Sequence, residues 1–229
     1  MSTIERAEAR TLPPLEEGQR LDRATFHERY EAMPPGTWAE LIGGVVYMGS
    51  PAGYSHGKNH SAANLWLCHY ERSTPGVESL DNASTALDDE GEPQPDLSLR
   101  LLPDAGGRTR VEADLLTGVP ELVLEISKSS RKFDLGAKKA EYERVGVLEY
   151  VVVALEPDEV FWHVLRDGKF ERLPAGLDGL YRSEVFTGLW LDPEAFFARD
   201  LDGLLAALDR GLATPEHAEF AARLARGGR

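Results

Sequence analysis

The chain has 229 residues, of which 42% are hydrophobic and 28% charged, and it carries a formal net charge of -14 at pH 7. This length allows one sizeable core with appended pieces, and the absence of any apolar run of about 18 residues predicts no membrane association. The single cysteine, Cys68, excludes an internal disulfide and a cysteine-based zinc cage. The negative charge disfavours binding of nucleic acid by bulk electrostatics.

The first 20 residues show no pattern of a folded element. They are polar, contain proline and lack periodic apolar positions, so we expect residues 1–20 to form a flexible segment. Alternating charges and no apolar stretch before a cleavage site argue against a secretory leader, which predicts a cytoplasmic protein. We expect one folded domain over residues 21–192 and a helical extension over residues 193–229.

The first predicted elements follow from residue spacing. Helical spacing over residues 23–33 precedes a turn and a pair of strands within 38–51, which Gly43 and Gly44 interrupt. Residues 56–72 predict an amphipathic helix of the core.

The middle of the chain predicts extended segments. Residues 77–103 form two of them, joined by an acidic turn, because Pro93 and Pro95 forbid a helix there. Residues 118–127 are an apolar run too short for a typical helix and too continuous for a half-exposed strand. We therefore predict a central strand that is buried on both faces.

A βαβ unit and two further structures complete the predicted fold. A helix over about 134–145 ends at Gly146, and residues 149–155 form a second buried strand. Asp-Gly between two alternating runs predicts a hairpin over 159–173. Two capped helices are predicted at the C-terminal end, over 192–211 and 214–227.

Glu125 interrupts the predicted central strand with a carboxylate. Side chains alternate along a strand, so Glu125 points to the same face as Ser127. A buried carboxylate needs a compensating cation, a metal ion or several hydrogen-bond donors. All three remain open, and Asp96, at the start of a predicted strand, offers a second carboxylate for a shared metal ion.

Neighbouring strands would bring these two acids together. Asp96 and Glu125 would then converge on an oxygen-liganded Mg²⁺ or Mn²⁺, with the carbonyl of Ile126 as a third oxygen. This arrangement is the metal hypothesis for the site.

The predicted helix after Glu125 offers a cation. Asp134, Lys138 and Tyr142 are spaced four apart and so lie on nearly one face, which we expect to look at the same site. Lys138 would there orient a water nucleophile or stabilise charge on a phosphoryl oxygen. The plainer alternatives are a structural pair of Glu125 with Lys138 or Arg131, and Asp134 as an N-cap that also pairs with Lys138.

Histidines and basic residues provide further candidates. His56 and His60 are also four apart, but their segment lacks the glutamate of a zinc-protease signature, which favours a substrate-facing hydrogen bond or helix-start polarity for His56. The basic run of Lys128, Arg131 and Lys132 is the best candidate for contact with phosphate.

Several stretches resemble a known family. "PD" at 95–96, "ELVLEIS" at 121–127 and "DLGAKKAEYERVGVLEYVVV" at 134–153 resemble the PD-(D/E)XK nuclease superfamily. More narrowly, they are similar to the Uma-two family of restriction endonucleases. "WAELIGGVVYMGSP" at 38–51 looks like the opening segment of that family, so the resemblance spans about residues 22–192.

The resemblance implies an α/β, restriction-endonuclease-like fold, with a mixed central β-sheet flanked by α-helices and extra C-terminal helices. It also implies Mg²⁺-dependent hydrolysis of phosphodiester bonds in nucleic acid, with DNA as the expected substrate. Asp96 and Glu125 would be the metal ligands and Glu40 an accessory acid. Ser127 stands where the superfamily motif has a lysine, and the narrower family takes that lysine from the next helix, here Lys138.

Other functions remain open at this stage. A catalytically inactive nuclease fold that serves as a binding or regulatory module is consistent with Ser127 and the acidic composition. A glycosidase with two carboxylates is less favoured, because the exposed aromatic platforms of such sites cannot be located in the sequence. Cleavage of both strands of a duplex would predict a homodimer. The apolar face of the C-terminal helices is a candidate contact, and its alternative use is to cover one side of the sheet.

Overall fold

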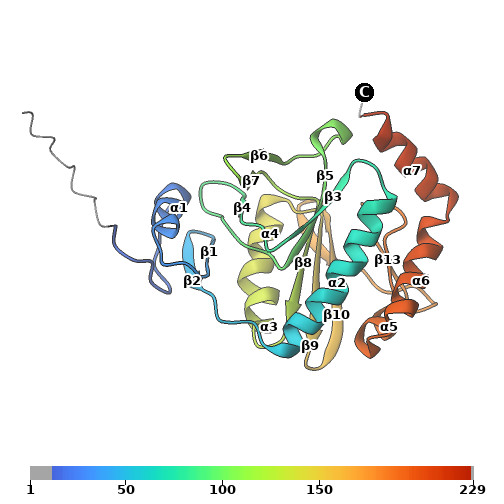
Figure 1. Ribbon diagram of the computed structural model, residues 1–229, viewed down its shortest axis with the longest axis horizontal. Coiled ribbons are helices and arrows are strands. Elements are labelled where there is room, and N and C mark those ends of the chain that lie inside the picture. The colour runs from blue at the N-terminus through green and yellow to red at the C-terminus, as the bar shows by residue number, and fades with distance from the viewer. Residues whose placement is uncertain (1–11, 228–229) are drawn as a thin grey trace, which may run out of the picture.

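A computed structural model describes residues 12–227 and contains a six-stranded mixed sheet. The strands lie in the order β11, β10, β9, β8, β5 and β3 (Figure 1). Their bounds are β3 Val77–Asp81, β5 Leu97–Leu101, β8 Leu122–Ser127, β9 Glu149–Leu155, β10 Asp158–Arg166 and β11 Lys169–Arg172. β8 and β9 run parallel, and the other neighbours in this sheet run antiparallel.

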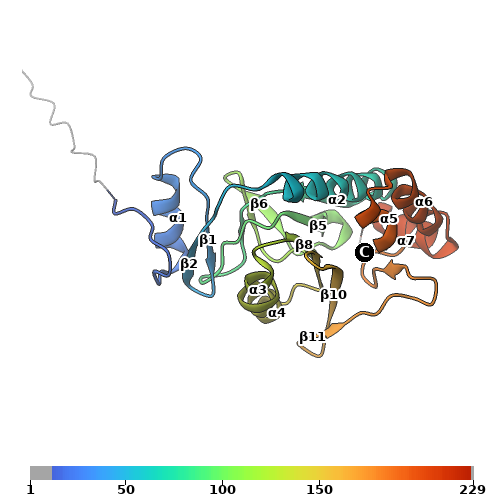
Figure 2. The ribbon, with the colours of Figure 1, turned by 90° about the horizontal axis from the view of Figure 1, so that it is seen from below.

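Helices cover both faces of this sheet (Figure 2). One face carries α2 (Tyr54–Ser73), α5 (Pro193–Ala198), α6 (Leu201–Leu212) and α7 (Pro215–Ala225), which bury the main core. The other face carries α3 (Arg131–Phe133), a π-helical turn (Asp134–Lys138) and α4 (Lys139–Val145). Every residue of β8 is buried between these layers, as predicted for a central strand. Within residues 12–227, no helix combines the length and apolarity that a membrane crossing needs.

The remaining elements pack around the main sheet. α1 (Arg23–Glu31) and the hairpin of β1 (Ala39–Ile42) and β2 (Val45–Met48) lie at the end opposite the C-terminal helices (Figure 1). A three-stranded sheet combines β4 (Thr85–Ala86), β6 (Arg110–Glu112) and β7 (Leu115–Thr117). The smaller elements are a 3₁₀ turn (Pro103–Ala105) and the pair β12 (Tyr181–Arg182) and β13 (Trp190–Leu191).

Part of the segment that we expected to be flexible is packed. Leu15 is buried in the small core beneath α1, and the amide of Gly18 donates to the carbonyl of Val46 at 2.8 Å. The guanidinium of Arg29 also donates to the carbonyl of Pro13 at 2.8 Å. Residues 12–20 therefore lie against the β1–β2 hairpin, because a lone apolar side chain and backbone hydrogen bonds attach them. Residues 1–11 lie outside the described residues.

Two predicted helices have different boundaries in the structure. The helix expected from residue 134 begins at Arg131, so Asp134 lies inside it and is not its N-cap. The helix expected over 192–211 is divided into α5 and α6, because Arg199 adopts a left-handed φ of 61°. Asp200 then starts the second helix by accepting a hydrogen bond from the amide of Gly203 at 2.9 Å.

Candidate active site

The candidate site lies where β5 begins beside the end of β8. The two strands pair with Leu97 opposite Leu124, and the same register continued by one residue sets Asp96 opposite Glu125. Directly opposed residues of antiparallel strands have Cβ atoms about 4.5–5.5 Å apart and project to the same face. The backbone amide of Asp96 lies 3.4 Å from Oε2 of Glu125, and Oδ2 of Asp96 accepts from the amide of Ile126 at 2.7 Å. The pairing of the strands thus brings the two acids together.

Both acids line a cavity of about 880 Å³ that also receives residues from the β1–β2 hairpin and from the start of α2. Most of the predicted site residues lie in its wall: Glu40, His56, Asp96, Glu125, Ile126, Lys128, Asp134 and Lys138. Ser127 is fully buried, and Tyr142 reaches Glu125 from within the core. Arg131 and Lys132 are not part of the wall.

Lys138 places a cation against Glu125. Its Nζ lies 2.9 Å from Oε1 of Glu125 and 3.0 Å from Oε1 of Glu40, and its side chain is 6% exposed. The hydroxyl of Tyr142, one helical turn further along, donates to the same Glu125 oxygen at 3.3 Å. The predicted common face of Lys138 and Tyr142 therefore meets Glu125. The ion pair of Glu125 with Lys138, one of the plainer alternatives, is therefore present and buried.

The protonation of this cluster follows from its burial. Burial raises the pKa of Glu125 well above its usual value, and the ammonium of Lys138 opposes that shift. Burial would lower the pKa of Lys138, but the negative charges of Glu125 and Glu40 outweigh it and hold that pKa well above its usual value. Lys138 therefore stays an ammonium ion at neutral pH.

Asp134 lies in the wall of the cavity without serving as the expected partner of Lys138, which reaches Glu125 and Glu40 instead. Its carboxylate accepts from the hydroxyl of Ser130 at 2.6 Å, and burial raises its pKa. The helix here makes a π turn, in which the amide of Lys139 bonds the carbonyl of Asp134 five residues back. Such single turns are rare and frequently occur at functional sites.

Glu40 joins the hairpin to the loop that carries Asp96. Its Oε1 accepts from the amide of Gln94 at 2.8 Å as well as contacting Lys138. The β1–β2 hairpin is thereby tied to the site through one carboxylate. This places Glu40, inferred only from the family resemblance, in the same cluster as Glu125.

The three basic residues that were expected to contact phosphate lie in different surroundings. Lys128 lies in the cavity wall, with its Nζ 2.8 Å from Glu156. Arg131 instead pairs with Glu159 at 3.0 Å and covers the ring of Phe161. Lys132 is exposed outside the cavity. Of the three residues expected to contact phosphate, Lys128 is the one positioned beside the two acids.

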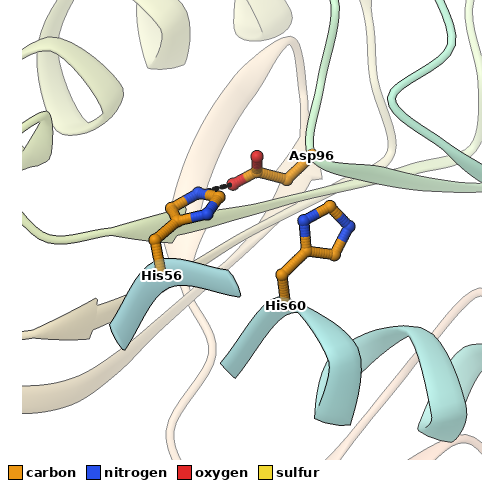
Figure 3. A group of neighbouring side chains, drawn as sticks. All are labelled: His56, His60 and Asp96. Carbon is orange, nitrogen blue, oxygen red and sulfur yellow. Dashed lines mark hydrogen bonds and ion pairs between the residues drawn. The ribbon is translucent and has the colours of Figure 1, made fainter. Parts of the chain in front are cut away.

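His56 forms an ion pair with Asp96. Its Nε2 lies 3.1 Å from Oδ2 of Asp96 (Figure 3). The hydrogen bond that the imidazole donates to Asp96 raises the pKa of His56 above its usual value of 6.5. Burial would raise the pKa of Asp96, but the hydrogen bonds from His56 and from the amide of Ile126 outweigh it and lower that pKa. His56 thus makes a hydrogen bond within the chain, to Asp96, whereas the substrate-facing bond considered from the sequence stays a prediction.

We expect the imidazole of His56 to titrate above pH 6.5, and to titrate at a lower pH in Asp96→Asn, because the neutral amide no longer stabilises the imidazolium. Two-dimensional NMR of the histidine ring protons measures both values. The ring signals of His69, which pairs with Asp209 elsewhere on α2, provide the internal reference. A His56 titration that does not move in Asp96→Asn would contradict the ion pair.

Sequence reasoning missed two exposed aromatic residues and one histidine at this cavity. Trp38 and Tyr54 line it and are 50% and 86% exposed. His60, which we had set aside together with a zinc site, lines it as well. The signal for Trp38 and Tyr54 was their position beside turns, outside the apolar patterns of the helices and strands. Exposed aromatic platforms therefore exist, and their expected absence no longer argues against a glycosidase.

Comparisons with known proteins address the family and the fold. A family model described as "Uma2: Putative restriction endonuclease" matches residues 24–194. A solved structure described as a "putative nuclease belonging to DUF820 from Anabaena variabilis ATCC 29413" has a TM-score of 0.60 at 14% sequence identity, covering 75% of this chain and 96% of that chain. No curated protein matches the chain. The likeness in structure confirms the predicted fold class, a mixed central sheet flanked by helices.

Proposed function

The chain belongs to the Uma2 family, whose description is "Putative restriction endonuclease", and from this premise we propose that it hydrolyses phosphodiester bonds of DNA with Mg²⁺ or Mn²⁺. The observation that carries the proposal is the meeting of Asp96 and Glu125 at one cavity, with the ammonium of Lys138 2.9 Å from Glu125. Two carboxylates and a fixed cation are the parts that metal-assisted phosphodiester hydrolysis needs.

The residues present fit a hard divalent cation. Carboxylate and carbonyl oxygens are the ligands that Mg²⁺ prefers, and Asp96 and Glu125 offer carboxylates. The N–H and C=O groups of one strand residue point to the same side, and the N–H of Ile126 points at Asp96. Its carbonyl is therefore directed toward the same gap, beyond the last β5–β8 pair. Asp96, Glu125 and the Ile126 carbonyl would hold the ion.

When bound, a divalent cation supplies a Lewis acid and lowers the pKa of a coordinated water. The residues of the chain do the rest. Lys138 keeps its proton and stabilises the charge that grows on a phosphoryl oxygen, so it acts as a cation rather than as a base. Glu40 and Tyr142 are positioning residues, because they fix Lys138 and Glu125 respectively. In the reaction, water adds to phosphorus, one P–O ester bond breaks, and the departing oxygen takes a proton.

The mouth of the cavity supports a nucleic-acid substrate in spite of the net charge of -14. Stacking of a base on an aromatic side chain contributes about 1–3 kcal/mol and does not depend on positive charge. Trp38 and Tyr54 offer such surfaces in the wall that also holds Lys128. We therefore assign base contact to the two aromatic residues and phosphate contact to Lys128.

Nicking of supercoiled plasmid by the purified full-length chain tests the proposal. We expect conversion to open-circle DNA in Mg²⁺ or Mn²⁺ and no conversion in EDTA, with calorimetry showing binding of Mn²⁺. The alternative of an inactive binding or regulatory module, suggested by the uncharged, buried Ser127, predicts neither cleavage nor binding at millimolar metal. That pair of results would overturn the proposal.

Cleavage of both strands of a duplex leads us to include a homodimer in the proposal. Of the two uses considered for the apolar face of the C-terminal helices, the structure supports the second, which is to cover one side of the sheet. Phe196, Leu204 and Leu208 are buried in the main core over the sheet.

A further inference from the structure

Two histidines and one aspartate approach one another at the start of α2. One ligand atom from each of His56, His60 and Asp96 lies within 4.8 Å of the other two (Figure 3). His56 and His60 are one helical turn apart, so both rings project to the side of the helix that faces Asp96. Asp96 comes from the segment entering β5, which explains why the sequence alone suggested a pair of histidines without a third ligand.

We propose that His56, His60 and Asp96 form a second metal site that takes a transition-metal dication such as Zn²⁺ or Co²⁺. Imidazole nitrogens suit these metals, whereas the carboxylate and carbonyl oxygens around Glu125 suit Mg²⁺. Three protein ligands with an open fourth position are the pattern of zinc sites that bind water or substrate. The two sites share Asp96, but this one rests on its own ligands and does not depend on nuclease activity.

The spacing of the ligand atoms fits a small tetrahedral ion. Bonds of about 2.0–2.1 Å place two ligands of one tetrahedral metal about 3.3 Å apart. Nε2 of His56 and Oδ2 of Asp96 are already 3.1 Å apart. Since one ligand atom from each of the three residues lies within 4.8 Å of the other two, closing the site needs an approach of about 1.5 Å or less, which small side-chain rotations supply.

A second, independent observation concerns the ring nitrogen of His60 that points away from Asp96. Its Nε2 lies 3.1 Å from Oδ1 of Asp81, at the end of β3. The amide of Asn64, one turn further along α2, donates to the other Asp81 oxygen at 2.7 Å and fixes that carboxylate. A histidine that binds a metal through one nitrogen usually presents the other to a carboxylate, which orients the ring. Asp81 lies beside that nitrogen at ion-pair distance, although the contact does not have the geometry of a hydrogen bond, and the second ring nitrogen faces Asp96 (Figure 3).

Titration of the full-length, tag-free protein with Co²⁺ tests the proposal, because bound Co²⁺ gives visible absorption bands that report nitrogen and oxygen ligands. We expect one equivalent per chain to depend on His60. His60→Gln should raise the Kd by more than tenfold, and Asp81→Asn, which leaves all three ligands in place, by about tenfold or more. His69→Gln provides the matched control, because His69 lies on the same helix but pairs with Asp209.

Glu125→Gln separates this proposal from the nuclease proposal. We expect this variant to keep the Co²⁺ bands, because Glu125 is not a ligand of the second site. If the wild-type protein binds Co²⁺ but does not cut plasmid, the second metal site is retained and only the nuclease proposal fails. Wild-type protein without Co²⁺ bands, or folded His60→Gln and Asp81→Asn proteins that bind Co²⁺ like wild type, would overturn the second site.

Discussion

Glu125→Gln is expected to lower Mg²⁺-dependent plasmid nicking by at least about 100-fold, the usual consequence of removing one fixed electrostatic group from an active site. Glutamine keeps the volume of glutamate and can still accept from Tyr142, but it removes one of the two anionic ligands that the proposed ion needs. Lys138 retains Glu40 as a partner, 3.0 Å away, so the fold is not expected to collapse.

A matched control distinguishes this effect from a general loss of charge. Glu143 lies on α4 and pairs with Lys169 at the surface, so Glu143→Gln should cut plasmid like the wild type. Circular dichroism and thermal unfolding would verify that both variants are folded. Cleavage by Glu125→Gln at the wild-type rate would show that the activity comes from a contaminant or from another site.

Lys138→Met is expected to lower the free energy of unfolding by about 3–5 kcal/mol at neutral pH, because removing one partner of a buried ion pair leaves an uncompensated charge. Glu125 and Glu40 lose their shared cation in this variant, whereas methionine preserves most of the apolar packing of lysine. Urea unfolding at neutral pH measures the loss. Lys139→Met, one position further along the same helix and not within the buried pair, is the control.

The same variant has a characteristic dependence on pH. Without Lys138, the pKa of Glu125 in the folded state rises further above its ordinary value of 4.5, since Lys138 is the group that opposes the effect of burial. The folded variant then binds a proton that the unfolded chain releases, so its stability falls as the pH rises from that ordinary value through the raised folded pKa. We expect the deficit relative to wild type to shrink at acidic pH. A deficit that is constant with pH would indicate lost packing and not uncompensated charge.

The two acids and the lysine were accessible from the sequence because local rules place them. A continuous apolar run predicted the strand of Glu125, and a spacing of four put Lys138 and Tyr142 on one face. Pro95 indicated a strand that begins at Asp96, one residue before the observed start of β5. Adjacent strands then brought the acids together. The family match supports these assignments at the level of fold and nuclease family.

Other features depend on contacts distant in sequence and could not be predicted. The π turn at Asp134–Lys138 departs from regular α-helical geometry. It is accompanied by a tertiary contact, the hydrogen bond from the Tyr150 hydroxyl to the Asp134 carbonyl. His60 was set aside because its segment lacks the glutamate of a zinc-protease signature, and Asp96, which the structure brings near it, lies 36 residues further along the chain. The attachment of residues 12–20 rests on one buried side chain, Leu15, in an otherwise polar stretch.

Glu125 and its neutralising amine belong to different elements, a strand and the helical segment that follows it. The reactivity of the carboxylate therefore depends on how that helical segment packs, for example on the hydrogen bond from the Tyr150 hydroxyl to the Asp134 carbonyl. If the proposed ion binds, substitutions that loosen this packing are expected to alter its affinity while Asp96 and Glu125 remain in place. When relatives are compared, a serine two positions after the strand acid is accordingly no evidence of lost activity, provided that the helical segment still places an amine beside that acid.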